Sequence, residues 1–325
     1  MVLFQNPTVD DIKKAALIIQ NGGLVSFPTE TVYGLGADVF NTTAIAKVFQ
    51  VKKRPHFDPL ICHVSTIETV EKLAFIPNSD LFNTLTKAFW PGPLTIILPK
   101  KDIVPDLITG GLDTVAIRMP DNDIALKLIE YSTGAIAAPS ANPFGYISPT
   151  RASHVIDTIG KNIDAIIDGG NATFGIESTV IDISTPIPQI LRYGSLAIED
   201  IESVLGCSLE YYSNINKLKF KSPGQIKKHY SPTKPLFRFS HPDELQGIDL
   251  SDAGVLYFNK KYSELSFKET FFLSESGNLI EAASKLFDIL HDMEESDIKT
   301  IYAISVPETG LGRAIEDRLN RASTR

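Results

Sequence analysis

The chain has 325 residues, of which 43% are hydrophobic, and it carries a formal net charge of −8. Its length exceeds the usual size of one domain, so two domains are expected. The acidic balance argues against a surface that coats nucleic acid, although it permits a local basic pocket. No apolar run approaches the roughly 20 residues that cross a bilayer, and the N-terminus has no secretory pattern.

The two cysteines, Cys62 and Cys207, are far apart and have neither ligand nor redox spacing. We interpret them as reduced thiols and expect a cytoplasmic protein without a membrane anchor. No set of His, Cys, Asp and Glu residues has the spacing of a protein metal site.

The first two hundred residues alternate helical and strand patterns, which predicts an α/β domain. Thr8 can cap a helix in which Ile12, Ala15, Ala16 and Ile19 share one face. Several strands follow one another without a helix between them, so the sheet is expected to be mixed. Further helices are expected at 43–50, 66–74, 80–89, 123–131, 153–159 and 199–205, and strands at 24–27, 60–64, 94–98, 114–119, 135–138, 165–168, 179–183 and 189–193.

Residues 211–242 contain no acidic residue but several lysines and two proline turns, a composition typical of a linker. Beyond it, strands are expected at 254–258 and 299–306. An amphipathic helix is expected at 279–293 and a final helix at 313–322. These elements predict a small second α/β domain.

Polar side chains crowd the end of the predicted strand 24–27. Two glycines follow them, Gly34 and Gly36. Hydroxyls and a carboxylate beside glycines that allow close backbone approach indicate a polar ligand, with an ordinary turn as the alternative. The polar residues are Thr29, Glu30, Thr31 and Tyr33.

Basic residues form a second candidate. Lys52 and Arg54 follow a predicted helix, where the macrodipole also favours a solvated basic end. Clustered cations repel one another unless an anion lies nearby, so we expect a phosphate or carboxylate ligand. Arg118, within an apolar strand, also needs an anionic partner, either a ligand or a protein carboxylate.

Weaker signals come from strand ends. Ser140 and Asn142 follow an apolar strand, where a simple turn is the alternative. Ser178 opens another strand and Arg192 ends one. His63, alone on a strand, is more typical of a structural residue than of a ligand.

Taken together, these segments resemble the YrdC-type threonylcarbamoyl-AMP synthase family, in its longer two-domain form. They occur in order and at compatible spacing over residues 10–205, and the linker and C-terminal segments extend the resemblance to essentially the full length. The segments are PTETVYGLG from Pro28, KKRP from Lys52, PLICH from Pro59, WPGPLT from Trp90, RMP from Arg118, PSAN from Pro139, SPT from Ser148, ESTVID from Glu177, LRYG from Leu191, SPGQIKKHYSP from Ser222 and GRAIEDRL from Gly312.

The resemblance implies an open, twisted mixed sheet whose helices help to form a concave basic cavity, at residues 1–208. It also implies a basic linker across the active site at 209–233 and a small Rossmann-like α/β domain at 234–325. The implied reaction joins L-threonine, bicarbonate or CO2, and ATP to give threonylcarbamoyl-AMP and pyrophosphate. The product serves formation of threonylcarbamoyladenosine at position 37 of tRNA. It would pass to a tRNA threonylcarbamoyl transferase complex, and direct tRNA binding is left open. Mg2+ is expected to arrive with the ATP phosphates.

The resemblance also implies roles for individual residues. Arg118 would pair the threonine carboxylate, and Thr29, Glu30, Thr31 and Tyr33 would form the threonine-recognising wall. Asp58 replaces the asparagine of many relatives, and its carboxylate would repel phosphate unless it meets the metal. The threonine residues are Thr31, His63, Arg118, Ala138 and Ser178; the ATP residues are Lys52, Arg54, Asp58, Thr114, Ser140, Asn142, Ser148, Arg192 and Tyr230; the catalytic ones are Lys52, Arg54, Ser140 and Asn142.

Two other classes compete with a nucleotidyltransferase. A nucleic-acid-binding module is disfavoured by the acidic charge and by the lack of basic residues interleaved with aromatics. A carbamoyl-transfer domain with a different acceptor is disfavoured because zinc-finger spacing and acylphosphatase-like appendages are absent from the sequence.

Overall fold

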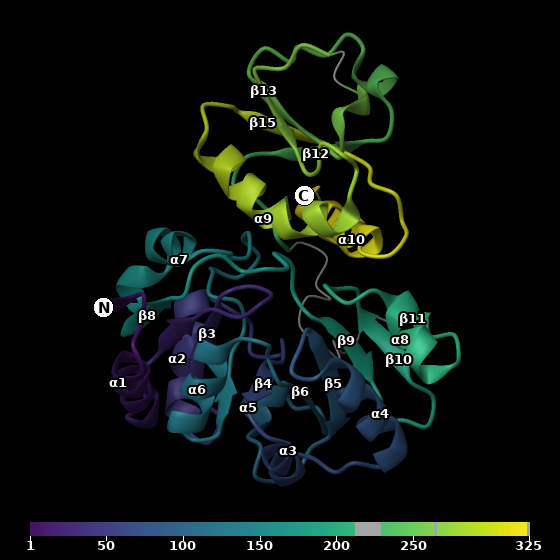
Figure 1. Cartoon of the computed structure of the whole chain (residues 1–325). Coiled ribbons are helices and arrows are strands. Elements are labelled where there is room, and N and C mark those ends of the chain that lie inside the picture. Colours follow the sequence, from purple (N-terminus) through teal and green to yellow (C-terminus); the bar gives the residue numbers. More distant parts are fainter. Residues whose placement is uncertain (212–228, 263–264, 324–325) are drawn as a thin grey trace.

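The computed structural model describes residues 1–211, 229–262 and 265–323, and it places two sheets in two units (Figure 1). The larger unit holds an eleven-stranded sheet in the order β1-β8-β2-β3-β7-β4-β6-β5-β9-β10-β11. The sheet contains both parallel and antiparallel pairs, so the predicted mixed sheet is confirmed. Its strands are β1 Val2–Gln5, β2 Val25–Phe27, β3 Gly34–Asp38, β4 Ile61–Val64, β5 Leu94–Pro99, β6 Thr114–Arg118, β7 Ala135–Ala137, β8 Ala165–Asp168, β9 Thr179–Asp182, β10 Gln189–Arg192 and β11 Glu210–Tyr211.

Helices of the larger unit begin at polar caps. Thr8 caps α1 through a reciprocal bond with Asp11, and Asn41, Thr66, Asn78 and Asn122 cap later helices with their side chains. None of these helices contains a residue that was predicted to lie in a strand. They are α1 Val9–Gln20, α2 Thr42–Lys52, α3 Ile67–Leu73, α4 Ser79–Phe89, α5 Asp106–Thr109, α6 Asp123–Tyr131, α7 Ala152–Thr158 and α8 Ile198–Leu205.

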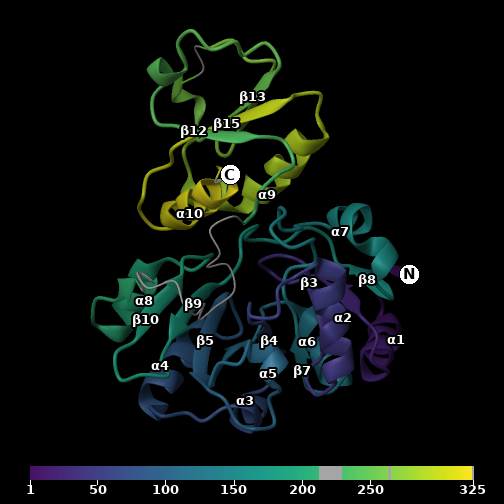
Figure 2. The same cartoon turned by 180° about the vertical axis from the view of Figure 1, so that it is seen from behind.

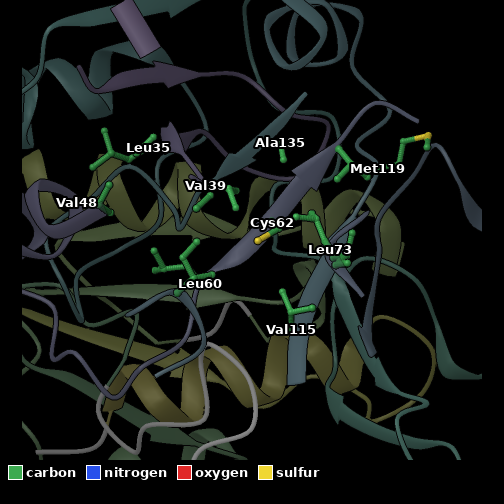
Figure 3. Close-up of a cluster of buried hydrophobic side chains, with 14 of the residues drawn as sticks. Leu35, Val39, Val48, Leu60, Cys62, Leu73, Val115, Met119 and Ala135 are labelled. Atoms are coloured by element: carbon green, nitrogen blue, oxygen red, sulfur yellow. The ribbon is translucent and has the colours of Figure 1, made fainter. Parts of the chain in front are cut away.

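The main apolar core lies between one face of this sheet and its helices. Leu35, Leu60 and Val115 come from three different strands or strand ends and meet there without exposed surface (Figure 3). Cys62 lies in the same cluster as a free thiol. Each buried side chain of this size contributes about 1.5–3 kcal/mol relative to exposure. This core makes the large sheet a rigid support for polar residues on its opposite face.

The smaller unit is an all-parallel, four-stranded sheet in the order β12-β15-β13-β14. It contains β12 Leu236–Phe239, β13 Ala253–Tyr257, β14 Glu269–Phe272 and β15 Thr300–Ile304, with helices α9 Leu279–Glu295 and α10 Gly312–Ser323. In both views α9 and α10 lie between the small sheet and the larger unit (Figure 2). No helix in the described ranges is both long and apolar enough to span a membrane.

The predicted linker is only partly described. Its first residues form β11, which pairs with β10 in the large sheet, and residues 212–228 lie outside the described part. The acid-free composition extends through β12. The predicted linker, 211–242, therefore included a strand that belongs to the small sheet.

The two units meet through apolar contacts, in which Val32, Ile147 and Ile176 join the core of the smaller unit, and through polar contacts from α9 and α10. Arg151 at the start of α7 reaches Asp288 at 2.6 Å, and His154 stacks on His291 with ring centroids 3.7 Å apart. Gly175 lies very close to the backbone of α9, because a Cβ there would lie 2.1 Å from the carbonyl oxygen of Ser284. The docking of the two units therefore requires glycine at this position.

We predict that Gly175→Ala weakens this docking. Gly175 and Gly170 both have left-handed backbones, with φ of +69° and +84°, but a Cβ at Gly170 would meet nothing within 4 Å. Both alanine variants carry the left-handed strain of about 1–2 kcal/mol. Gly175→Ala adds the clash with Ser284. It should therefore lower the free energy of unfolding in urea further than Gly170→Ala and enlarge the radius of gyration in X-ray scattering. Equal losses and equal radii in the two variants would contradict this role for Gly175.

Candidate functional site

A row of polar side chains crosses the face of the large sheet opposite the main core. The strand register pairs His63 on β4 with Arg118 on β6. Thr95 on β5 and Arg192 on β10 both pair with Val180 of β9. Below this row, Ile61, Ala116 and Ile97 belong to a small apolar cluster on the same strands. Because side chains alternate between faces with period two, these strands present their polar residues to one cavity.

The cavity is lined mainly by residues of the large sheet and of the loops that adjoin its strands. It brings together most of the residues that the sequence singled out. Its lining consists of Thr29, Thr31, Val32, Gly34, Arg54, Ile61, His63, Arg118, Ala138, Pro139, Ser140, Glu177, Ser178, Arg192, His229 and Tyr230.

Arg118 occupies the centre of the row and is 3% exposed. Its Nη2 lies 2.6 Å from Oε1 of Glu30, and its Nη1 donates to the Thr31 hydroxyl at 2.9 Å. A protein carboxylate therefore supplies the anionic partner that the sequence required. The cavity still borders the guanidinium, so a ligand carboxylate could share or replace the Glu30 contact.

The residues of the threonine-rich segment after β2 have different roles. Thr29 donates to the carbonyl of Val32 at 2.6 Å and lies 2.9 Å from the Thr31 hydroxyl, which orders the loop beside Arg118. Tyr33 does not line the cavity; its hydroxyl donates to the carbonyl of Gly170 at 2.7 Å. The segment thus presents two hydroxyls to the cavity, while Tyr33 holds a neighbouring loop.

Gly34 and Gly36 differ from the expected role. A Cβ at Gly36 would lie 2.9 Å from side-chain atoms of Phe27 and Ile136, and one at Gly34 would lie 3.2 Å from the Phe27 ring. The glycines therefore let β3 pack against that ring. Only Gly34 also borders the cavity.

Lys52 and Arg54 are buried rather than solvated, with 1% and 6% exposure. The Lys52 ammonium donates to the backbone carbonyls of Ser140 and Asn142 at 2.6 and 2.5 Å. Burial, together with the neighbouring Arg54 charge, lowers the pKa of Lys52 well below its ordinary value. Lys52 thus anchors the 140–142 loop from behind, while Arg54 reaches the cavity wall.

Asp58 forms an ion pair with Arg54, with 2.8 Å between Oδ2 and Nη2. Arg54 also donates to the backbone carbonyl of Pro59 at 2.8 Å. Burial raises the pKa of Asp58 and the Arg54 charge opposes that rise. The Asp58 carboxylate is therefore directed at a protein cation and does not line the cavity.

Other predicted residues lie just outside the lining. Asn142 donates from Nδ2 to the carbonyls of Pro143 and Tyr146, both at 2.9 Å, and so shapes the loop after Ser140. Thr114 lies on the same face of β6 as Arg118, four residues earlier, at a strand distance of roughly 13 Å. A ligand that contacted both residues would have to extend along the strand.

Ser178 and Arg192 close the far side of the cavity. The Ser178 hydroxyl lies 2.7 Å from that of Thr95, and Arg192 donates to the Ser178 carbonyl and hydroxyl at 2.9 and 3.0 Å. Gly194 makes this possible, because a Cβ there would lie 2.3 Å from the backbone of Ser178. Burial lowers the pKa of Arg192.

Four site-region residues were absent from the sequence prediction: Thr95, Glu177, His229 and Arg318. Thr95 and Glu177 stand inside motifs that the sequence had marked, so strand alternation could have assigned Thr95 to the cavity face. His229 and Arg318 also lie in quoted motifs, those that begin at Ser222 and Gly312, but neither residue was given a role. Arg318, on α10, is separated from Glu177 by 141 residues of chain.

The cavity combines buried guanidinium groups with serine and threonine hydroxyls and with the imidazoles of His63 and His229, whose pKa values burial lowers. Across the described parts of the chain, no three His, Cys, Asp or Glu side chains group so that they could hold a metal ion. Fold and site therefore define an α/β protein with a cavity lined by arginines and hydroxyls, a lining typical of sites that bind small anions.

Comparison with known proteins narrows this class. Residues 17–194 match the family described as "Telomere recombination", and residues 196–324 match "Threonylcarbamoyl-AMP synthase, C-terminal domain". Threonylcarbamoyl-AMP synthase of Pyrococcus abyssi is 41% identical, over 96% of this chain and 94% of the relative. That of Bacillus subtilis is 40% identical, over 96% of this chain and 92% of the relative. The crystal structure of P. abyssi Sua5 complexed with L-threonine superposes with a TM-score of 0.90 at 40% identity, covering 99% of this chain and 97% of that one.

The chain therefore belongs to the threonylcarbamoyl-AMP synthase family, in its two-domain form.

The buried His63 makes the free energy of unfolding depend on pH. Burial, and secondly the Arg118 charge, lower the pKa of His63 to about 3. Between pH 6.5 and 3 the unfolded chain therefore binds a proton that the folded chain does not. The contribution of His63 to the free energy of unfolding is therefore fully present above pH 6.5. As the pH falls below 6.5, this contribution decreases by roughly 1.4 kcal/mol per pH unit.

We predict that His63→Gln makes the free energy of unfolding less dependent on pH below 6.5, by about that slope. Urea titrations from pH 7.5 to 4.5 would measure it. His241→Gln is the control for the substitution itself, since the His241 ring is 63% exposed and lies outside the cavity lining; an equal change of slope in both variants would contradict the prediction. An unchanged slope in His63→Gln would show that His63 titrates alike in both states.

Proposed function

We propose that this protein joins L-threonine, bicarbonate or CO2, and ATP to form threonylcarbamoyl-AMP and pyrophosphate. The product would supply the threonylcarbamoyl group of threonylcarbamoyladenosine at position 37 of tRNA, through a tRNA threonylcarbamoyl transferase complex. The observation that carries the proposal is the row of His63, Arg118 and Arg192 across one cavity of a chain that matches synthases over nearly its full length.

The threonine end of the cavity centres on Arg118. Its planar guanidinium suits a carboxylate, and a substrate carboxylate would take a position beside the one that Glu30 holds. Thr31 and Ser178 line the same space with hydroxyls, which can bond the substrate's amine and hydroxyl. The Nδ1 atom of His63 is buried and makes no hydrogen bond within the described structure, so it can accept one from the substrate.

The nucleotide end lies toward Arg54, Ser140 and Arg192. Both arginines border the cavity while their other donors are engaged by backbone carbonyls. Fixed cations of this kind can meet phosphate charge without reorganising during the reaction. Tyr230 and His229 close the cavity above these groups, and Lys52 supports the loop that carries Ser140.

The proposed reaction depends on positioning the reactants more than on covalent catalysis by the protein. The threonine amine must lose its proton before it captures CO2 as a carbamate, and a neutral His63 would not repel the ammonium form. A carbamate oxygen then attacks the α-phosphorus and pyrophosphate leaves. Such a transfer depends on holding the reactants in line and on cations that stabilise the developing charge.

In this proposal Mg2+ enters the site together with ATP. The nearest carboxylates are committed to protein cations, since Asp58 pairs with Arg54 and Glu177 with Arg318. The ion would therefore be held by the ATP phosphates, whose charge it would partly neutralise.

The first experiment measures pyrophosphate release from ATP with and without L-threonine and bicarbonate. We expect release to require both, because the carbamate is the attacking group. L-Alanine serves as the control substrate, since it forms a carbamate but lacks the hydroxyl. Release that is independent of threonine would refute the proposed function.

Arg118→Lys should weaken threonine binding by about tenfold or more. A charge-assisted hydrogen bond contributes about 1.5–3 kcal/mol, and 1.4 kcal/mol corresponds to tenfold. Lysine keeps the charge next to Glu30 but loses the planar fork. Calorimetric titration with L-threonine would measure the change, with ATP binding measured in parallel.

Arg238→Lys is the matched control, because Arg238 pairs with Glu316 at 2.7 Å within the small unit and does not line the cavity. It should bind threonine as the wild type does. Wild-type affinity in Arg118→Lys would remove Arg118 from the threonine site.

A further inference from the structure

The second domain places one charged side chain against the cavity wall. Arg318 extends from α10, and its side chain is 0% exposed. Its Nε donates to Oε2 of Glu177 at 3.1 Å, and its guanidinium carbon lies 5.0 Å from the ring centroid of Tyr230. Both partners line the cavity. Arg318, a residue of the small domain, therefore contacts two lining residues of a cavity that is itself lined by residues outside the small domain.

Glu177 transmits this contact to the large domain. Its second oxygen, Oε1, accepts the hydroxyl of Ser148 at 2.5 Å. One carboxylate thus ties Ser148 to Arg318 across the domain boundary. Asp317 completes the arrangement, because it accepts from Arg318 at 2.9 Å and is itself held by Arg321.

Tyr230 depends on the same domain. Its ring is stacked on Phe287 of α9 at 5.4 Å between centroids, and Arg318 lies over the ring in a cation–π contact. Its backbone is left-handed, with φ of +62°, a conformation that costs a non-glycine residue of order 1–3 kcal/mol. Contacts from α9 and α10 therefore hold a strained residue over the cavity.

A purely structural role explains Arg318 poorly. An ion pair this deeply buried is often no more stable than an apolar pair of similar volume, because both charges lose their hydration. The Nη2 atom of Arg318 makes no hydrogen bond among the residues that the structure describes. An interface that needed only adhesion would gain from a leucine or methionine at this position.

We propose that Arg318 is a positioning residue for ATP: it fixes the Glu177–Ser148 pair on one side of the cavity and Tyr230 on the other. The nucleotide end of the site is then complete only when the second domain is docked. This inference rests on the proposed function and concerns the same site. It assigns Arg318 no contact with the reacting atoms.

The test is Arg318→Met, which keeps the length of the stem and removes the charge. We expect the KM for ATP to rise by roughly 10- to 100-fold, the scale of a small misplacement of binding groups. The affinity for L-threonine, measured by calorimetry without ATP, should remain within twofold. Arg318→Lys should recover part of the ATP affinity, because it restores a cation beside Glu177.

Arg313→Met is the matched control. Arg313 also comes from α10 and also forms an ion pair across the domain boundary, with Glu199, but it is partly exposed and does not line the cavity. It should show wild-type KM for ATP. A rise of equal size in Arg313→Met would mean that any loss of docking acts in the same way, and it would overturn the specific role of Arg318.

Two results separate this inference from the proposed function. A wild-type protein that releases no threonine-dependent pyrophosphate refutes the function, whereas an active wild type with an unchanged Arg318→Met variant refutes the inference alone. Should Arg318→Met fail to fold by circular dichroism, Glu177→Gln weakens the same pair from the other side at nearly constant volume. A wild-type KM for ATP in Glu177→Gln would then overturn the inference.

Discussion

Buried positive charge is the constraint on which the rest of this structure depends. Lys52, Arg54, Arg118, Arg192 and Arg318 are each at most 6% exposed, and all are gathered around one cavity. Removing such charges from water costs several kcal/mol apiece unless oxygens replace the lost hydration. The fold supplies those oxygens in two forms, as backbone carbonyls and as the carboxylates of Glu30, Asp58 and Glu177. Each cation is thereby fixed in direction before any ligand arrives, which is the condition for electrostatic preorganisation.

The large sheet makes this arrangement possible by its two unlike faces. One face carries the apolar core seen in Figure 3, and the other carries the polar row above a small apolar floor. Strand alternation assigns residues to faces, so a single sheet both anchors the domain and presents the site. The second domain then supports one wall of the cavity. Its helices α9 and α10 face the cavity side, and its Arg318 and Phe287 hold Tyr230 there.

The sequence predicted most of the regular elements because their local signals agree. The helix α1 has a capping box and a clear apolar face, and α9 has the same face over a longer span, so both were located to within a residue or two. The strand β3 was missed because glycine is depleted in strands, and here the Phe27 ring requires glycines. The strand β12 was hidden in a linker-like composition, and the edge strands β1, β11 and β14 were also missed.

The candidate site was predictable in its residues but not in its pairings. Ordered motifs marked Thr31, Arg118, Ser178 and Arg192, all of which line the cavity. No local pattern indicates that Glu30 pairs with Arg118, that Lys52 lies behind a loop, or that Arg318 reaches Glu177 across 141 residues of chain. Such pairings are set by strand register and domain docking, which are long-range consequences of packing. His63 shows the same limit, since its significance comes from its neighbour on β6 and not from its own segment.

The central claim is that these buried cations form a substrate site and are not merely a polar core. Its most direct test is mass spectrometry of the soluble products after incubation with ATP, L-threonine and carbon-13-labelled bicarbonate. We expect an adenylate that contains threonine and one labelled carbon, and that disappears when threonine is omitted. Unlabelled AMP or ADP as the sole nucleotide product would contradict it.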